Sequence, residues 1–171
     1  MNKEYPLPGI KTNDINILPD ERGFFAEILR NDYKDFIDEW PVQVNLSYSF
    51  PGIVRAWHRH DMGQVDYFIA LKGAAKICAY NENTKSLVEI INNANKPSIT
   101  RVPGHYLHGF KAISDEPLLI IYFVNRIYNR TNPDEVRRPW NDRGIVPLEI
   151  NGDNNDPRVG KPWDWFFPPY K

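Results

Sequence analysis

Short runs rich in Val, Ile, Tyr and Phe recur through the middle of the chain, and each is bounded by Gly, Pro, Asn or Asp. Residues of this kind favour strands, and the flanking residues favour turns. The spacing therefore predicts an all-β sandwich or barrel. The runs are QVNLSYSF (43–50), VDYFIALKG (65–73), AAKICAYN (74–81), SLVEII (86–91), SITRVP (98–103) and LLIIYFVN (118–125).

The rest of the chain predicts little regular structure outside this β core. Residues 31–40, NDYKDFIDEW, show the pattern of a helical turn, which Pro41 ends. The 15 prolines crowd toward the two ends, which predicts extended arms that wrap the core and reach a second subunit. We see no repeat, low-complexity tract or linker in the 171 residues, so we expect one domain over 1–171.

Composition argues against several classes of function. A formal charge of -1 is not the footprint of a nucleic-acid-binding protein. We find no signal-peptide-like run and no stretch near the roughly 18 apolar residues that a membrane helix needs, so we expect a cytoplasmic protein without a membrane partner. The single Cys78, within KICAY, is expected to be a buried and unreactive strand residue.

All four histidines fall in two short stretches, GIVRAWHRHDMGQVD (52–66) and VPGHYLHGF (102–110). Strand alternation places His58 and His60 on one face and Trp57 on the other. If the run after Gly63 returns antiparallel, Gln64 lies near this pair. A β interior could then bring His108 to the same place.

One chemistry that suits such a cluster is proton abstraction next to a ketone. Neutral His58 could accept the proton while Arg55 or His108 stabilises the enolate oxygen. Tyr128 could return a proton to the opposite face of the substrate. Regular alternation turns Arg55 away from His58, so this reading requires a bulge between them.

A second chemistry is metal coordination. Neutral imidazoles of His58, His60 and His108, together with the carbonyl of Gln64, suit one divalent transition metal with open positions for substrate. His60 distinguishes the two readings, because a metal-free proton transfer by His58 does not need a second histidine there.

Guanidinium groups are the natural ligands of a diphosphate, and Arg22, Arg55 and Arg59 are the candidates. Arg22 could equally form a turn ion pair with Asp20. The basic run Arg126, Arg130, Arg137 and Arg138 lies beside acidic residues and is expected to be a solvated face.

Several motifs, taken in order, resemble a known family. The pattern G-x5-H-x-H-x3, followed here by Gln64, and the later P-x4-H are typical of cupins. DERGFFAE (20–27), QVNLSYS, GIVRAWH, KG at 72–73, PGHYLHGF and the Tyr122–Tyr128 pair resemble the dTDP-4-dehydrorhamnose 3,5-epimerase family of that superfamily. The resemblance implies a double-stranded β-helix or jelly roll with extended N- and C-terminal arms, a nucleotide-sugar substrate and no metal. It also implies a homodimer formed by exchanged N-terminal strands.

The resemblance also implies roles for individual residues. It places catalysis on His58, with Arg55, His108 and Tyr128 beside it. Its substrate-binding positions fall on Arg22, Glu27, Gln43, Asn45, Arg59 and Asp66. Asp66 stands where the family has a lysine, and the aspartate of the family's His-Asp dyad has no evident counterpart. Three hypotheses therefore remain: a sugar-nucleotide epimerase, a metal-dependent cupin enzyme and a non-catalytic sugar-nucleotide-binding cupin.

Overall fold

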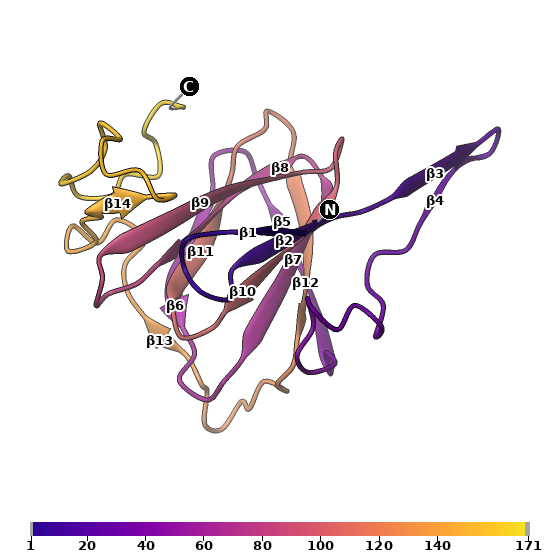
Figure 1. The fold of residues 1–171 in the computed structure, drawn as a ribbon, viewed down its shortest axis with the longest axis horizontal. Coiled ribbons are helices and arrows are strands. Elements are labelled where there is room, and N and C mark those ends of the chain that lie inside the picture. The colour runs from indigo at the N-terminus through magenta and orange to yellow at the C-terminus, as the bar shows by residue number, and fades with distance from the viewer. Residues whose placement is uncertain (1, 170–171) are drawn as a thin grey trace.

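The computed structural model describes residues 2–169, and the fourteen regular elements of that range are all β-strands (Figure 1). They form two six-stranded sheets and one separate hairpin. The first sheet has the order β1 (Asn2–Glu4), β2 (Lys11–Asp14), β10 (Ser98–Pro103), β7 (Val65–Lys72), β12 (Leu118–Val124), β5 (Gln43–Ser49). The second has the order β13 (Val136–Arg137), β6 (Val54–Arg59), β11 (Leu107–Ala112), β8 (Ala74–Tyr80), β9 (Ser86–Asn93), β14 (Glu149–Ile150).

The two sheets enclose the main core, and the jelly roll expected from the sequence is confirmed. Inward side chains of both sheets meet in one cluster, represented by Phe68 and Ile120 from the first sheet and by Ile77 and Phe110 from the second. All six predicted apolar runs are strands. Every residue of β8 is buried, because its outer face is covered as well as its inner face. This explains why its sequence is apolar almost throughout.

The helical turn expected in residues 31–40 is present, but it does not extend into a helix. The backbone N–H groups of Phe36 and Ile37 both donate to the carbonyl of Tyr33, 2.9 Å away. This single turn already buries Phe36 against Tyr67, so no longer helix is needed to cover the apolar side chains. The expected antiparallel return of β7 beside β6 is wrong: β6 pairs with β11 and β13, whereas β7 pairs with β10 and β12. The turn between them crosses from one sheet to the other.

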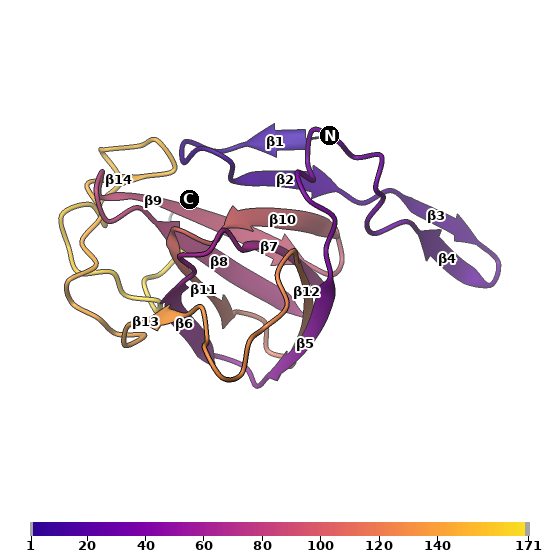
Figure 2. The same cartoon turned by 90° about the horizontal axis from the view of Figure 1, so that it is seen from below.

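Both terminal arms are present. Strands β1 and β2 extend the first sheet beside β10, and the hairpin of β3 (Ile17–Asp20) and β4 (Gly23–Ala26) projects away from the sandwich (Figures 1 and 2). The C-terminal segment covers the outer face of the second sheet. There Trp57 packs on Trp165, with ring centroids 4.7 Å apart, and Trp163 is buried beside them. Trp140, in contrast, is 45% exposed.

Strand β5 has an inverted pattern. Its polar side chains, such as Gln43 and Asn45, face the interior and are half-buried, whereas Val44, Leu46 and Tyr48 are exposed. A strand at the edge of a sheet normally turns its apolar face inward. The inversion turns the polar face of β5 toward the interior and leaves an apolar row exposed on its other side. Within residues 2–169 no helix is long and apolar enough to cross a membrane.

Candidate active site

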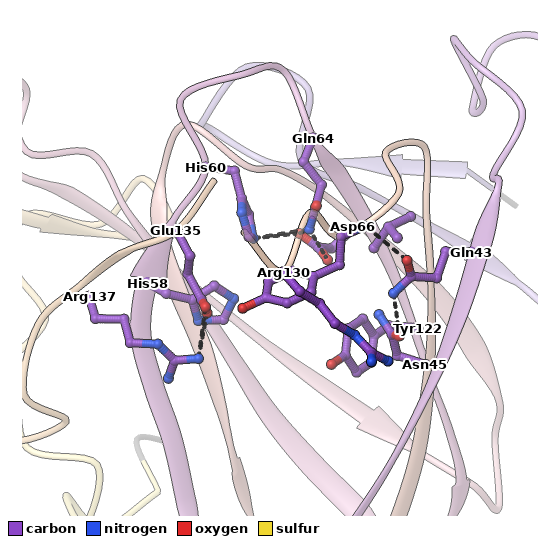
Figure 3. Close-up of a pocket in the computed structure, with 12 residues that line it drawn as sticks. Gln43, Asn45, His58, His60, Gln64, Asp66, Tyr122, Arg130, Glu135 and Arg137 are labelled. Atoms are coloured by element: carbon purple, nitrogen blue, oxygen red, sulfur yellow. Dashed lines mark hydrogen bonds and ion pairs between the residues drawn. The ribbon is translucent and has the colours of Figure 1, made fainter. Parts of the chain in front are cut away.

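A cavity of about 410 Å³ opens at one end of the sandwich, between the two sheets (Figure 3). Strands of both sheets supply its walls, and the loop that joins β12 to β13 crosses it. It is lined by Gln43, Asn45, His58, His60, Gln64, Asp66, Tyr122, Val124, Tyr128, Arg130, Glu135 and Arg137. Most of these side chains are polar, so the cavity suits a polar ligand that needs several hydrogen bonds.

A β-bulge at Trp57 decides which residues of β6 face the interior. His58 pairs with His108 and Ala56 pairs with Gly109, so the register shifts across Trp57. Trp57 turns outward to the C-terminal segment, while Arg55 and His58 both line an adjoining cavity of about 350 Å³. The bulge that the catalytic reading required is therefore present.

His58 is held as a neutral imidazole. Burial lowers its pKa well below the ordinary value, and positive charge on His108, His60 or Arg137 acts in the same direction. The ring of His58 lies 4.2 Å from that of His108, centroid to centroid. A neutral imidazole at the wall of a polar cavity can accept a proton from a bound ligand.

His60 and His108 are fixed in orientation by backbone carbonyls. Nδ1 of His108 lies 2.8 Å from the carbonyl oxygen of Tyr106, and Nδ1 of His60 contacts the carbonyl oxygen of Asp134. Since a carbonyl only accepts, Nδ1 is the protonated nitrogen in both rings. Each Nε2 atom is thereby left facing the other imidazoles.

The carboxylate of Asp66 lies next to the Nε2 atoms of His60 and His108, and Asp66 is 1% exposed. Its Oδ2 atom is 3.3 Å from Nε2 of His108 and 3.8 Å from Nε2 of His60. The amide nitrogen of Gln64 lies 3.0 Å from Nε2 of His60 and 3.1 Å from Oδ1 of Asp66. The carboxylate can only accept, so it requires the amide nitrogen at this place. Asp66 is thus a buried partner of the histidines.

The same cluster has the spacing of a metal site. Ring nitrogens of His58, His60 and His108 all lie within 4.8 Å of one another. Anchoring of Nδ1 on a carbonyl is also typical of histidines that bind metal through Nε2. The expected fourth donor differs, because Gln64 directs its amide nitrogen, and not its carbonyl oxygen, toward His60.

The arginines expected to bind a diphosphate are engaged elsewhere. Arg59 pairs with Asp61 at 3.0 Å and with Glu82 at 2.7 Å, and it does not line the cavity. Arg55 donates to the hydroxyl of Ser49 and to the carbonyl of Tyr48. Arg22 pairs with Asp20, which is the turn ion pair considered as the alternative to a phosphate ligand.

The other positions expected to bind substrate divide into two groups. Gln43 and Asn45 line the cavity, and the amide nitrogen of Gln43 donates to Asn45 at 2.7 Å. Tyr128 also lines it, and its backbone N–H donates to Gln43 Oε1 at 2.9 Å. Arg22 lies in the projecting hairpin and Glu27 directly after it, and neither lines the cavity.

Four polar residues of the cavity were not expected there. Tyr122, on β12, lines both cavities, and burial raises its pKa, as do Asp66 and Glu135. Arg130, Glu135 and Arg137 come from the segment between β12 and the end of β13. Arg130 and Arg137 are exposed, as expected for a solvated face, but they also line the cavity, which was not expected. Only the two-residue pairing of β13 with β6 brings Arg137 beside His58.

Comparison with known proteins supports this reading of the fold. The chain is 35% identical over 139 residues to the probable low-salt glycan biosynthesis epimerase of Haloferax volcanii, which covers 77% of this chain and 86% of the relative. It is 32% identical over 144 residues to a spore coat polysaccharide biosynthesis protein of Bacillus subtilis, covering 81% of this chain and 93% of the relative.

Among solved structures, the dTDP-6-deoxy-D-glucose-3,5-epimerase of Legionella pneumophila, in complex with dTDP-4-keto-L-rhamnose, superposes with a TM-score of 0.75. It covers 85% of this chain and 80% of its own, at 22% identity. The chain thus shares the jelly-roll architecture of this solved sugar-nucleotide epimerase. The chain belongs to the polysaccharide biosynthesis C-terminal domain family, whose model matches residues 18–136.

Proposed function

We propose that this protein is an epimerase that acts on a nucleoside-diphosphate 4-keto-6-deoxy sugar. The observation that supports this most is His58, a half-buried neutral imidazole at the wall of a polar cavity of about 410 Å³. The relative in Haloferax is a probable epimerase, and the solved structure from Legionella holds a dTDP-4-keto sugar. Both favour the same class of substrate.

The reaction needs two proton transfers at one carbon. His58 takes the proton from the carbon next to the ketone, and the bonding electrons of that C–H bond move to the ketone oxygen to form an enolate. A positive or hydrogen-bonding group close to His58 stabilises this oxygen. Arg55 is the candidate, because it lines the adjoining cavity with His58, whereas the ring N–H of His108 already donates to the carbonyl of Tyr106. A proton returned to the opposite face forms the new C–H bond, and solvent then restores the protonation state of His58 and of the proton donor.

Two tyrosines can return the proton. Tyr122 is half-buried on β12, and its raised pKa keeps the phenol protonated. Tyr128 is 48% exposed on the crossing loop, at the position that the family resemblance favours. Tyr122→Phe and Tyr128→Phe separate them: loss of the true donor blocks inversion while exchange of the abstracted proton with solvent continues.

The direct test is incorporation of deuterium from D2O into dTDP-, CDP-, UDP- and GDP-4-keto-6-deoxy sugars. We expect exchange with one of them, slowed by about 10²- to 10⁴-fold in His58→Asn, because that is the usual contribution of a general base. His105→Asn is the matched control, since His105 is exposed and does not line the cavity. Wild-type protein without exchange on any substrate would instead favour the non-catalytic binding protein.

We also propose that the chain forms a homodimer. Val44, Leu46 and Tyr48 are 58%, 66% and 52% exposed in one row along β5, and the projecting hairpin exposes Phe24 and Phe25. Apolar rows of this kind on an edge strand are normally covered by another chain. In such a dimer the hairpin would bring Arg22 and Glu27 near the partner's cavity.

Light scattering tests the dimer. We expect twice the chain mass of 20.0 kDa for the wild type, and a shift toward monomer for Leu46→Asp. Leu148→Asp is the control, because Leu148 is 57% exposed but lies away from β5. A wild-type monomer at micromolar concentration contradicts the proposal.

The three clustered imidazoles favour a metal-dependent enzyme as a second candidate. His58, His60 and His108 could hold one divalent transition ion, which would polarise the ketone oxygen as a Lewis acid. Elemental analysis of protein made without a polyhistidine tag decides between the candidates. About one ion per chain, lost in His60→Ala with the fold retained, supports the metal enzyme. A folded, metal-free protein that still exchanges the substrate proton supports His58 as the base.

A further inference from the structure

Two arginines reach the cavity from a segment that no sequence pattern places there. Arg130 lies on the loop between β12 and β13, and Arg137 ends β13. Both line the cavity that contains His58. In Figure 3 the side chain of Arg130 extends across the cavity, and Arg137 lies on the same side as His58 and Glu135.

Strand pairing fixes the side to which Arg137 points. Arg137 lies directly opposite His58 in the antiparallel pairing of β13 with β6. Residues directly opposite one another in such a pair project from the same face. Because His58 faces the cavity, Arg137 faces it as well. Its guanidinium is paired with Glu135 at 2.8 Å, and its side chain is 74% exposed.

Arg130 is a cation without a counter-ion among the described residues. Its side chain makes no hydrogen bond or ion pair with another residue of 2–169. Neither carboxylate of the cavity wall pairs with it: Glu135 pairs with Arg137, and Asp66 accepts from the amide of Gln64. The guanidinium of Arg130 is therefore free to meet an anionic ligand group.

The loop that bears Arg130 is held on both sides of it. The N–H of Tyr128 donates to Gln43 Oε1 at 2.9 Å. The carboxylate of Asp134 accepts from the N–H groups of Asp61 and Met62 at 2.8 and 2.9 Å. Arg130 thus lies between two anchored points of the loop. This lowers the conformational entropy that is lost when a ligand binds to its side chain.

We propose that Arg130 and Arg137 bind the diphosphate of the substrate, in place of the engaged Arg59 and Arg55. This rests on the proposed function, which supplies a nucleoside-diphosphate ligand. Arg130 provides uncompensated charge and a planar fork for the phosphate oxygens. Arg137 adds a second guanidinium group beside His58. The diphosphate is then bound close to His58, and the attached sugar ring can reach this imidazole.

The test compares ligands with and without the diphosphate. Binding of dTDP, CDP, UDP and GDP, and of the corresponding nucleosides, is measured by calorimetry for wild type, Arg130→Gln and Arg137→Gln. We expect Arg130→Gln to weaken binding of the preferred diphosphate by about 10- to 100-fold, as for other charge-assisted hydrogen bonds, and to leave nucleoside binding unchanged. Arg137→Gln should weaken it less, because Glu135 already neutralises Arg137.

Arg143→Gln is the matched control. Arg143 is an exposed arginine that lines a different cavity, formed with the C-terminal aromatic residues. Equal diphosphate affinity in Arg130→Gln and Arg143→Gln overturns the inference, and so does an equal loss of affinity for diphosphate and nucleoside.

Deuterium exchange, measured on the same proteins, keeps this inference separate from the proposed function. Exchange by the wild type together with unchanged diphosphate affinity in Arg130→Gln removes the inference and leaves the epimerase. Lost diphosphate affinity in Arg130→Gln without exchange in the wild type leaves an anion site and removes the epimerase. A wild type that binds no nucleoside diphosphate overturns the inference outright.

Discussion

Gly109 on β11 lies against Ala56 on β6, so close that a Cβ atom added at position 109 would overlap Cβ of Ala56. This contact sits at the bulge that turns His58 toward the cavity. We expect Gly109→Ala to lower the free energy of unfolding by about 1–3 kcal/mol, because the strands must separate to admit the methyl group. Chemical denaturation measures this. Gly144→Ala is the control, since its Cβ would meet mainly its neighbour's side chain, Asp142; equal effects contradict the prediction.

Asp66 is the buried carboxylate next to the histidine cluster. Replacing it with alanine removes the buried carboxylate that accepts a hydrogen bond from the amide nitrogen of Gln64. We expect Asp66→Ala to reduce the free energy of unfolding by about 1–3 kcal/mol, the cost of unpaired buried polar groups. Asp66→Asn should cost less, because its carbonyl can still accept one bond. The exposed Asp115 provides the control Asp115→Ala, which should leave stability nearly unchanged.

The core and the histidine cluster could be predicted from the sequence, but the cations of the cavity could not. Alternation along single strands is a local property, so it gave the six central strands and brought His58 and His60 to one face. The third imidazole, His108, followed from a motif. Arg137 reaches the site only through the short pairing of β13 with β6. That pairing depends on the path of the loop between β12 and β13, and no periodic pattern in the sequence predicts this path. The pairing of Arg59 with Glu82 could not be predicted either, because the two residues are distant in the sequence.

Cys78 should be unreactive in the folded protein. It is fully buried on β8, and burial raises the pKa of its thiol well above the ordinary value, as does Glu89. The thiolate, which is the reactive form, is therefore scarce at pH 8. We expect no reaction with a thiol-specific reagent under native conditions and one thiol per chain in denaturant, as spectrophotometric titration would show. Rapid labelling of the native protein contradicts this.

The lowered pKa of His58 predicts how activity and stability depend on pH. Burial lowers that pKa first, so folded His58 stays neutral at pH values where an unfolded histidine, with a pKa of about 6.5, has taken up a proton. The base should therefore remain active when the pH falls to 6, and the acidic limb of kcat/KM should lie below the ordinary histidine range.

The same shift makes the folded state less stable in acid. Below about pH 6.5 the unfolded chain binds a proton at position 58 that the folded chain does not, so the free energy of unfolding falls as the pH falls. His58→Asn removes this contribution. We expect the variant to lose less stability than the wild type between pH 7 and pH 5, measured by denaturant unfolding at each pH. His105→Asn serves as the control. Burial lowers the pKa of His105 too, but this side chain is more exposed than that of His58, so its replacement should change the pH dependence of stability less. Parallel losses in wild type and His58→Asn would show that His58 is protonated as readily in the folded chain as in the unfolded one.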